Sequence, residues 1–395
     1  MQSWPSFIHE RTAKIPNIRQ RYPKTQYDPR LLIINQQSYL NFVSNDYLGL
    51  AAQPKLKQAL VLASSKYGIG STGAPTLSGY TAEHEKLANN LAKWLELDNC
   101  LLFSSGYQLN ASIFSQLVDS HTLIWLDRNC HASHIDGILL SKAKFTTFKL
   151  NMLDNIIAQI KQQPNKRHII LTEGSFSMDG TCSYLPQLIQ LKQAYPDNIL
   201  LIVDDAHGIG ALGTNGFGSL EQLGLNHKVI DLFIGTLSKT FASYGGFVCG
   251  EKSLINYLQQ TVRSQMFSTC LPANIAATSN AALEIIQSLD GAKLRDRLAK
   301  NINYFQQLSK EYNLPLYHSA SNVSPIQFLV FKDENTVKQL FNQLLNQDIL
   351  VGQILFPTVA TSAPRIRISL TASHTRADIK LLCNHLAKVC EYDTN

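Results

Sequence analysis

Short apolar runs alternate with amphipathic stretches over residues 83–285. Leucine and tryptophan recur at helical spacing in residues 83–96, which predicts an amphipathic helix. The apolar runs predict buried strands at residues 100–103, 123–126, 169–172, 199–203, 232–234 and 247–249. Apolar strands between helices indicate an α/β fold with a mostly parallel central sheet that helices cover on both faces. Active residues are then expected just past the carboxyl ends of the strands.

The pattern changes after about residue 285, where a smaller α+β domain is expected. A long helical stripe, two strands and two further helices are predicted at residues 294–308, 326–331, 366–370, 337–345 and 379–389. The proline-rich start of the chain resembles an arm rather than a domain. We expect three parts: an N-terminal arm over residues 1–44, a large α/β domain over 45–285, in which the strand ends carry the active residues, and a small domain over 286–395.

Composition and charge exclude several classes of protein. The chain has 395 residues, of which 45% are hydrophobic and 16% charged, as expected for a globular fold. A net charge of +6 without a basic run does not indicate nucleic-acid binding. The N-terminus lacks a secretory apolar region, and no apolar run approaches a membrane span. Seven scattered cysteines without C-x-x-C spacing predict reduced thiols, a cytoplasmic location and no metal site.

Three glycines at residues 68–73 spell G-x-G-x-x-G, the pattern of dinucleotide-binding loops. In such folds the motif follows a strand and opens a helix. Here it follows a helical pattern and runs into Ala-Pro, which favours a glycine-permissive loop instead.

Two segments place a carboxylate and a lysine just past apolar strands. Asp204 ends the run 199–203, and His207 follows it in the sequence VDDAH. Lys239 follows Gly-Thr-Leu-Ser directly after the run 232–234. Taken singly, Asp204 fits a helix N-cap as well as a functional acid, and Lys239 fits a solvated loop lysine.

Together these two side chains suit pyridoxal phosphate (PLP). PLP needs a lysine for its covalent linkage and an acid against its pyridine nitrogen, which stays protonated and lets the ring take up electrons from a substrate carbanion. Its phosphate needs small donors at a helix start. Gly106 and Tyr107 offer backbone N–H groups after a predicted strand, and Thr236 offers a hydroxyl beside the lysine. An ordinary strand-to-helix turn is the alternative for Gly106 and Tyr107.

Other polar residues follow predicted strands in the same way. His131 comes after the run 123–126, where an imidazole can stack on a flat cofactor and move protons. Ser177 follows the run 169–172 and is expected at the cofactor edge. A structural loop histidine and an ordinary turn are the alternatives. We expect His134 to be a bystander.

Two arginines share one face of the predicted strand at residues 366–370. Ile366, Ile368 and Leu370 alternate along it, so Arg365 and Arg367 lie together on the opposite face. An arginine there suits a bidentate grip on an amino-acid carboxylate. Two solvent-facing arginines on an edge strand are the alternative, and the pattern does not distinguish which of the two contacts a carboxylate.

Eight motifs, in this order, carry a resemblance to a known family. They are LNFVSNDYLGL (40–50), TLSGYTAEHEKL (76–87), LFSSGYQLN, DRNCHAS, TEGSFSMDG, VDDAHGIG, GTLSKTF and FSTCLP. Together they resemble the α-oxoamine synthases, which are PLP-dependent transferases of fold type I. The resemblance extends from about residue 18 to residue 388.

The resemblance implies a role for each matching residue. Lys239 would hold PLP and act as base and acid at the α-carbon of the amino acid, with Asp204 against the pyridine nitrogen and His131 on the ring face. His207, also in the catalytic set, and Ser177 would contact the phenolic-oxygen side of the cofactor. The remaining cofactor-binding residues implied are Gly106, Tyr107, Thr236, Ser268 and Thr269, the last two from the neighbouring subunit of a homodimer with shared active sites. The substrate-binding residues implied are Arg19, Asn45, His131, Thr358 and Arg367.

The most similar branch of the family condenses L-alanine with a pimeloyl thioester, on CoA or acyl carrier protein, and releases CO2 and free thiol. Leu355 stands where an arginine is expected near the acyl path, which puts the acyl group in question. Arg19 still matches the residue that is expected to meet the acyl chain, so the resemblance continues to favour a dicarboxylic acyl donor. The alternatives within the family are glycine C-acetyltransferase, 5-aminolevulinate synthase and a long-chain ketone synthase. A non-catalytic partner subunit is a different class, against which the intact Lys239 argues. A dinucleotide-binding protein would bind nicotinamide and show no lysine-linked chromophore.

Overall fold

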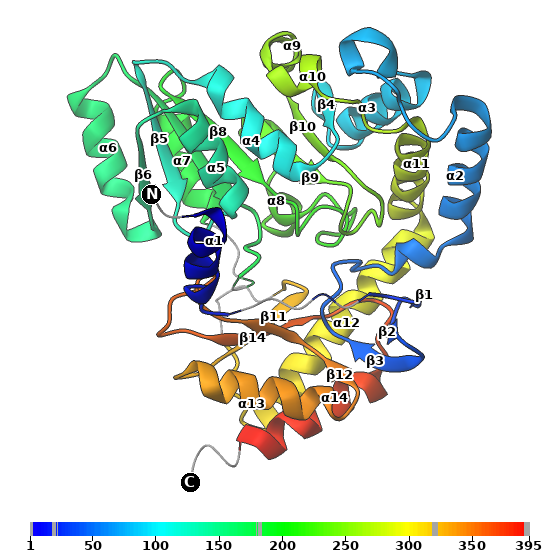
Figure 1. The fold of residues 1–395 in the computed structure, drawn as a ribbon. Helices are drawn as coiled ribbons and strands as arrows, with labels where there is room; N and C mark the ends of the chain where they lie inside the picture. The colour runs from blue at the N-terminus through cyan, green and yellow to red at the C-terminus, as the bar shows by residue number, and fades with distance from the viewer. Residues whose placement is uncertain are drawn as a thin grey trace.

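The computed structural model describes residues 3–17, 21, 23–178, 180, 184–317 and 323–390. The described chain forms two lobes, and the long helix α12 (Leu289–Glu311) runs from the upper lobe into the lower one (Figure 1). Within the described part of the chain, no helix combines the length and the apolar character needed to span a membrane.

The upper lobe is built on a seven-stranded sheet in the order β4-β10-β9-β8-β7-β5-β6. Its strands are β4 (Asn99–Phe103), β5 (Thr122–Asp127), β6 (Phe145–Phe148), β7 (Arg167–Glu173), β8 (Ile199–Asp204), β9 (Leu232–Thr236) and β10 (Gly246–Gly250). Neighbouring strands from β6 to β9 are parallel, whereas β10 runs against both β9 and β4. The mostly parallel sheet is confirmed. The strand β10 reverses because the loop 237–245 before it is too short for a helical crossover.

Helices bury both faces of this sheet. In β4, Cys100 and Leu102 join one hydrophobic core, and Leu101 and Phe103 join the other. The helices of the upper lobe are α2 (Pro54–Tyr67), α3 (Ala82–Trp94), α4 (Gly106–Leu117), α5 (Ala132–Ser141), α6 (Leu153–Gln162), α7 (Leu185–Ala194), α8 (Ser219–Gln222), α9 (Lys252–Thr261), α10 (Arg263–Phe267) and α11 (Ala273–Gln287). Buried side chains of α4, α5 and α9 belong to the second core, and those of α3, α6, α7 and α11 to the first. Short helical turns lie at Leu50–Ala52, Pro75–Gly79, Leu150–Met152 and His227–Val229.

In the described part of the chain, the lower lobe carries two small sheets and the helices that pack against them. The first sheet is antiparallel, with the order β11-β14-β13, and the second has the order β1-β2-β3-β12. Their strands are β1 (Gln26–Tyr27), β2 (Leu31–Ile34), β3 (Gln37–Asn41), β11 (Ile326–Val330), β12 (Ile349–Leu350), β13 (Gly352–Ile354) and β14 (Arg365–Ser369). The helices are α12, α13 (Glu334–Leu345) and α14 (Arg376–Cys390). Residues of both lobes share the first hydrophobic core, so the lobes are packed as one body.

The start of the chain joins the lower lobe. After the exposed helix α1 (Trp4–Ala13), strands β1 to β3 form a meander, and β3 pairs in parallel with β12. This pairing ties residues 37–41 to the C-terminal part of the chain and places the segment after them at the junction of the lobes. The division at residues 44 and 285 stays a prediction, and the second boundary falls in the last turn of α11.

The glycine motif at residues 68–73 follows a helix rather than a strand. Helix α2 ends at Tyr67, and Gly68 adopts φ +80°, a left-handed conformation that suits glycine. The strand–glycine–helix order of a dinucleotide site is therefore not present at this motif.

Candidate active site

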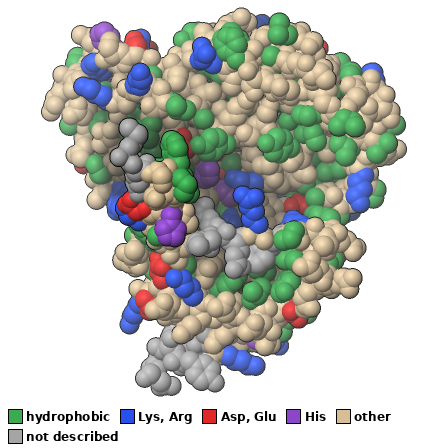
Figure 2. All heavy atoms as spheres, in the orientation of Figure 1, with side chains coloured by type: hydrophobic (Ala, Val, Ile, Leu, Met, Phe, Trp, Pro, Cys, Tyr) green, Lys and Arg blue, Asp and Glu red, His purple; other side chains and the backbone are tan. Residues whose placement is uncertain are grey.

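A cavity of about 270 Å³ opens at the carboxyl ends of the central strands. The strands β7, β8 and β9 end at Glu173, Asp204 and Thr236, which all line it. Gly106 at the start of α4 and His131 before α5 complete the wall. Figure 2 shows histidine and basic side chains gathered in the hollow between the upper and lower lobes. The site lies where a parallel sheet places its active residues.

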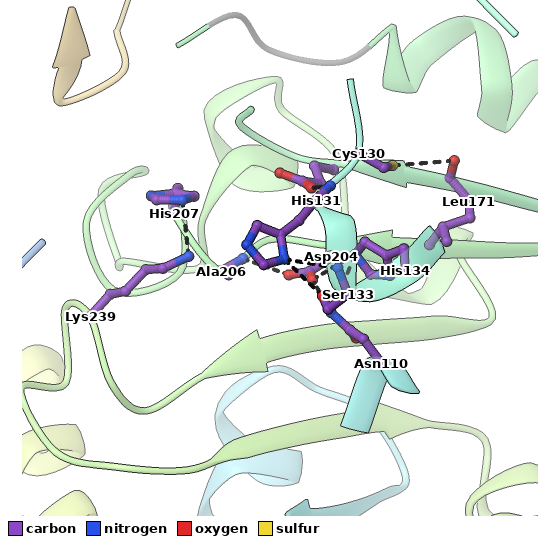
Figure 3. Close-up of polar contacts among 11 residues, drawn as sticks. Asn110, Cys130, His131, Ser133, His134, Leu171, Asp204, Ala206, His207 and Lys239 are labelled. Carbon is purple, nitrogen blue, oxygen red and sulfur yellow. Dashed lines mark hydrogen bonds and ion pairs between the residues drawn. The ribbon is translucent and has the colours of Figure 1, made fainter. Parts of the chain in front are cut away.

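Asp204 is a buried carboxylate held by three donors. Its Oδ2 accepts from His134 Nε2 at 3.0 Å and from Asn110 Nδ2 at 3.1 Å, and its Oδ1 accepts from the backbone N–H of Ala206 at 3.0 Å (Figure 3). Burial raises the pKa of Asp204, but the bonds from His134 and Asn110 and the charge of Lys239 outweigh it and bring the pKa below its ordinary value. The carboxylate is therefore ionised, as an acid partner of a protonated ring nitrogen must be.

Lys239 lies in the same cavity and ends a hydrogen-bonded chain. Its Nζ is 2.9 Å from Nε2 of His207, and Nδ1 of His207 is 2.7 Å from the hydroxyl of Tyr47. Burial lowers the pKa of Lys239 to about 8, against the opposing charges of Asp204 and Glu173. Burial and the charge of Lys239 hold the pKa of His207 well below its usual range. The neutral His207 ring thus accepts from Lys239 and donates to Tyr47.

Glu173 fixes the position of His131. The backbone N–H of His131 donates to Oε1 of Glu173, and the His131 side chain caps helix α5 through Ser133. Burial and the neighbouring charge of Asp204 raise the pKa of Glu173 well above its ordinary value. Burial and the charge of Lys239 lower the pKa of His131, which keeps this imidazole neutral at the cavity wall.

The cavity also presents polar groups that suit the expected cofactor. The hydroxyl of Ser177 lines the cavity, is buried and has no partner among the described residues. A buried polar atom without a partner costs about 1–3 kcal/mol, which a ligand acceptor would recover. Gly106 begins helix α4, whose first N–H groups suit a phosphate, and Thr236 lies beside it. Tyr107 follows Gly106 and also lines the cavity. The donor set therefore fits PLP.

Two residues from other parts of the chain extend the site toward the lower lobe. Arg367 on β14 donates from Nη2 to Oδ1 of Asn45 at 2.9 Å and from Nε to the carbonyl of Ser177 at 3.3 Å. Asn45 Oδ1 also accepts from Tyr47 at 3.1 Å, which connects Arg367 to the chain that ends at Lys239. Arg365 instead donates to the carbonyls of Ala363 and Met178. The geometry separates the two arginines that the sequence left equivalent.

Three further predicted site residues that the structure describes do not line the cavity. Ser268 Oγ accepts from Gln108 Nε2 at 2.8 Å, and the carbonyl of Thr269 accepts from the hydroxyl of Ser104. Thr358 is exposed, and its N–H donates to the carbonyl of Leu355. Arg19 lies outside the described residues.

The structure adds residues that the sequence reasoning passed over. His134 is not a bystander, and this expectation is wrong: it is fully buried and hydrogen-bonded to Asp204. The sequence motifs assign no role to Asn110, Glu173 or Tyr47. Glu173 could have been found because it ends the strand that pairs with β8, opposite Asp204. Asn110 lies one helical turn after Gly106, on the side that faces the cavity.

The comparisons with known proteins agree with this geometry. The family described as aminotransferase class I and II matches residues 37–386. A curated 8-amino-7-oxononanoate synthase of Cellvibrio japonicus is 35% identical over 98% of this chain and 96% of its own length. Another from Marinomonas sp. is 37% identical over 90% of this chain and 87% of its own length.

Solved structures show the same fold. An 8-amino-7-oxononanoate synthase of Francisella tularensis has a TM-score of 0.76 at 30% identity, covering 90% of this chain and 99% of that one. A serine palmitoyltransferase of Sphingomonas wittichii has a TM-score of 0.89 at 23% identity, covering 98% and 97%. The expected fold type I and the PLP cofactor are confirmed.

Proposed function

Because the chain belongs to the aminotransferase class I and II family, we propose that it is a PLP-dependent acyltransferase, an 8-amino-7-oxononanoate synthase of biotin biosynthesis. Its substrates are L-alanine and a pimeloyl thioester of CoA or acyl carrier protein. A bond forms between the alanine α-carbon and the thioester carbonyl carbon, and the C–S bond breaks. The alanine carboxylate leaves as CO2, which yields 8-amino-7-oxononanoate and the free thiol.

The observation that carries the proposal is the pairing of Lys239 and Asp204 in one cavity. Bound PLP withdraws electrons from the α-carbon of an attached amino acid and makes its proton acidic. Asp204, ionised and held by three donors, keeps the ring nitrogen protonated. Lys239 would hold the cofactor, and its pKa, lowered to about 8, suits its amine to accept the α-proton as a general base.

The remaining residues orient the groups around the reacting carbon. Arg367 presents its guanidinium beside Asn45 and suits a bidentate grip on the alanine carboxylate. His131 lines the cavity from the start of α5, where its imidazole would stack on the cofactor ring. His207 and Ser177 suit the phenolic oxygen of the cofactor, and Gly106, Tyr107 and Thr236 its phosphate end.

We further propose a homodimer with shared active sites. Ser268 and Thr269 lie beside the start of α4 but outside the Lys239 cavity of their own chain. A second copy placed against this surface would bring their hydroxyls to the phosphate end of its partner's cavity. Sedimentation of the purified protein should give twice the mass of one chain. A Lys239→Ala chain mixed with a Ser268→Ala, Thr269→Ala chain should then regain activity that neither has alone.

A second acyl specificity is favoured by one observation. Leu355 is only 7% exposed and packs in the hydrophobic core at the position expected to carry an arginine. Leu355 therefore offers no cation to a distal carboxylate of the acyl chain. Another α-oxoamine synthase, acting on glycine or on an acetyl, succinyl or long-chain thioester, is the competing function.

A product assay separates the two functions. Alanine and glycine are each combined with pimeloyl, acetyl, succinyl and palmitoyl thioesters, and the released thiol and the amino ketone are measured. We expect alanine with the pimeloyl thioester to give the highest kcat/KM. The gene should also restore growth without biotin to an auxotroph that lacks this step. Preference for another pair, together with failure to complement by folded protein, would establish the competing function.

The matched control is Lys239→Ala. This variant should lose both turnover and the visible absorption of the lysine-linked cofactor, because Lys239 is the only lysine among the described residues that line the cavity. Retention of both properties would overturn the assignment of Lys239.

A further inference from the structure

His134 lies directly behind Asp204 but does not line the cavity. It is the third residue of helix α5, its side chain is completely buried, and its Nε2 is 3.0 Å from Oδ2 of Asp204 (Figure 3). Asp204 lines the cavity, and so does Asn110, whose Nδ2 lies 3.4 Å from Nε2 of His134. His134 can therefore act on the cofactor only through residues of the cavity wall, of which Asp204 makes the shorter contact.

The His134 ring is held in one orientation. Phe114 packs edge-on against it, with ring centroids 6.2 Å apart and an interplanar angle of 72°. A carboxylate only accepts hydrogen bonds, so the proton of this contact lies on Nε2. Nδ1 is buried without a partner among the described residues.

The donors around Asp204 leave one acceptor position open. A carboxylate has about four lone-pair sites, and His134, Asn110 and the Ala206 N–H use three of them. With Oδ2 occupied twice, the open site is on Oδ1. The remaining lone pair of Oδ1 can accept one hydrogen bond, which is what a single protonated ring nitrogen would donate.

His134 also decides which of two buried acids is charged. Glu173 and Asp204 are paired across the neighbouring strands β7 and β8, and both are buried. Two negative charges on adjacent buried carboxyl groups would repel each other. Side-chain donors from His134 and Asn110 reach Asp204, whereas Glu173 accepts the backbone N–H of His131. The negative charge is therefore stabilised on Asp204.

We propose that His134 is a positioning residue that holds the Asp204 carboxylate charged and aimed at the ring nitrogen of PLP, without contacting the cofactor. This inference rests on the PLP site of the proposed function but not on the acyl substrate. A failure of the substrate assignment would therefore leave its test unchanged.

The test compares PLP with 1-deaza-PLP, which carries carbon in place of the ring nitrogen. Binding to the apoprotein is measured for wild type, His134→Leu and His134→Gln. A hydrogen bond to a charged group accounts for about ten-fold or more in binding. The Leu variant should bind PLP about ten-fold or more weakly but bind 1-deaza-PLP within about three-fold of wild type. Gln places an amide N–H near the position of Nε2 and should restore PLP binding to within about three-fold.

A matched control and a substitute variant complete the experiment. His168 is another buried histidine with one hydrogen bond, from Trp125 at 3.0 Å, and one nitrogen without a partner. His168→Leu should leave the ratio of PLP to 1-deaza-PLP affinity at the wild-type value. If His134→Leu does not fold, His134→Asn replaces it, because its shorter amide does not reach Oδ2. Equal weakening for both cofactors, or a Gln variant no better than Leu or Asn, would show a packing role and overturn the proposal.

Discussion

The cavity holds a lysine whose chemistry is set by burial. Burial lowers the pKa of Lys239 to about 8, whereas an ordinary lysine titrates near 10.4. Attachment of an aldehyde uses the neutral amine, whose fraction increases about tenfold per pH unit below the pKa. We expect the rate of PLP attachment to the apoprotein to rise in this way up to about pH 8 and to level off above it. Stopped-flow absorbance measures this rate.

The control for this profile is Nα-acetyl-lysine under the same conditions, whose rate should rise to about pH 10. This control also separates the titration of the amine from that of PLP. A protein rate that continues to rise tenfold per unit through pH 10 would contradict the lowered pKa of Lys239.

The sequence predicts some residues of the site and not others, for a physical reason. Lys239 and Asp204 could be predicted because each follows an apolar strand and the chemistry of PLP needs both. His134 could not be, because its role depends on the angle at which α5 packs against α4. A histidine on an apolar helix face has the same sequence pattern whether it packs in a core or contacts a carboxylate.

Helices α4 and α5 carry much of the cavity and pack unusually close together. A Cβ added to Gly137 on α5 would lie 2.0 Å from the carbonyl oxygen of Asn110 on α4. Neither atom can move without moving a helix. Gly137 therefore sets the distance at which α5 presents His131 and His134 to the site.

Gly137→Ala should reverse the usual effect of this substitution. In an exposed helix, Gly to Ala stabilises by roughly 0.5–1 kcal/mol. Here we expect a loss of about 1–3 kcal/mol in the free energy of unfolding, from the forced separation of the helices, together with weaker PLP binding. Chemical denaturation and a binding titration measure the two effects.

Leu139→Ala is the control on the same helix. Leu139 is 59% exposed, so removing its side chain should change stability by less than about 0.5 kcal/mol. An increase in stability of Gly137→Ala would show that α4 and α5 separate without cost.

Strands of the central sheet could be predicted from the sequence where most of their side chains are buried, and a strand with few buried side chains could not. The expected strands of the central sheet correspond to β4, β5, β7, β8, β9 and β10. The edge strand β6, with the sequence FTTF and two exposed threonines, lacks the apolar run that marks the others. Its pairing with β5 comes from the tertiary fold rather than from a local pattern.

At the scale of the molecule, the site is assembled from segments far apart in the chain. Asn45 follows the strands that join the lower lobe, and Arg367 lies on β14 of that lobe. Their contact, at 2.9 Å, lies beside the carbonyl of Ser177 from the upper lobe. No local pattern predicts this junction, because it depends on how the two lobes pack. Family resemblance supplied both residues, and the structure supplies their contact.

The junction predicts different effects for two neighbouring arginines. Arg367→Ala should raise the KM for the amino acid about 10- to 100-fold, because a bidentate charged contact is worth about 1.5–3 kcal/mol. PLP binding and its visible absorption should change little, since Arg367 does not line the cofactor cavity. Steady-state kinetics with the amino acid varied, together with a PLP titration, measure both quantities.

Arg365→Ala is the matched control on the same face of β14. Arg365 donates to the backbone carbonyls of Met178 and Ala363 and stacks over Phe328, so its loss should affect stability and leave the KM within about three-fold. If the two variants raise KM equally, the carboxylate is held by the shape of the junction rather than by Arg367. A larger effect of Arg365→Ala would assign the carboxylate to Arg365. We expect the larger effect from Arg367→Ala because Arg367, and not Arg365, hydrogen-bonds to Asn45. Through Asn45, the guanidinium of Arg367 is connected to the hydrogen-bonded chain that ends at Lys239.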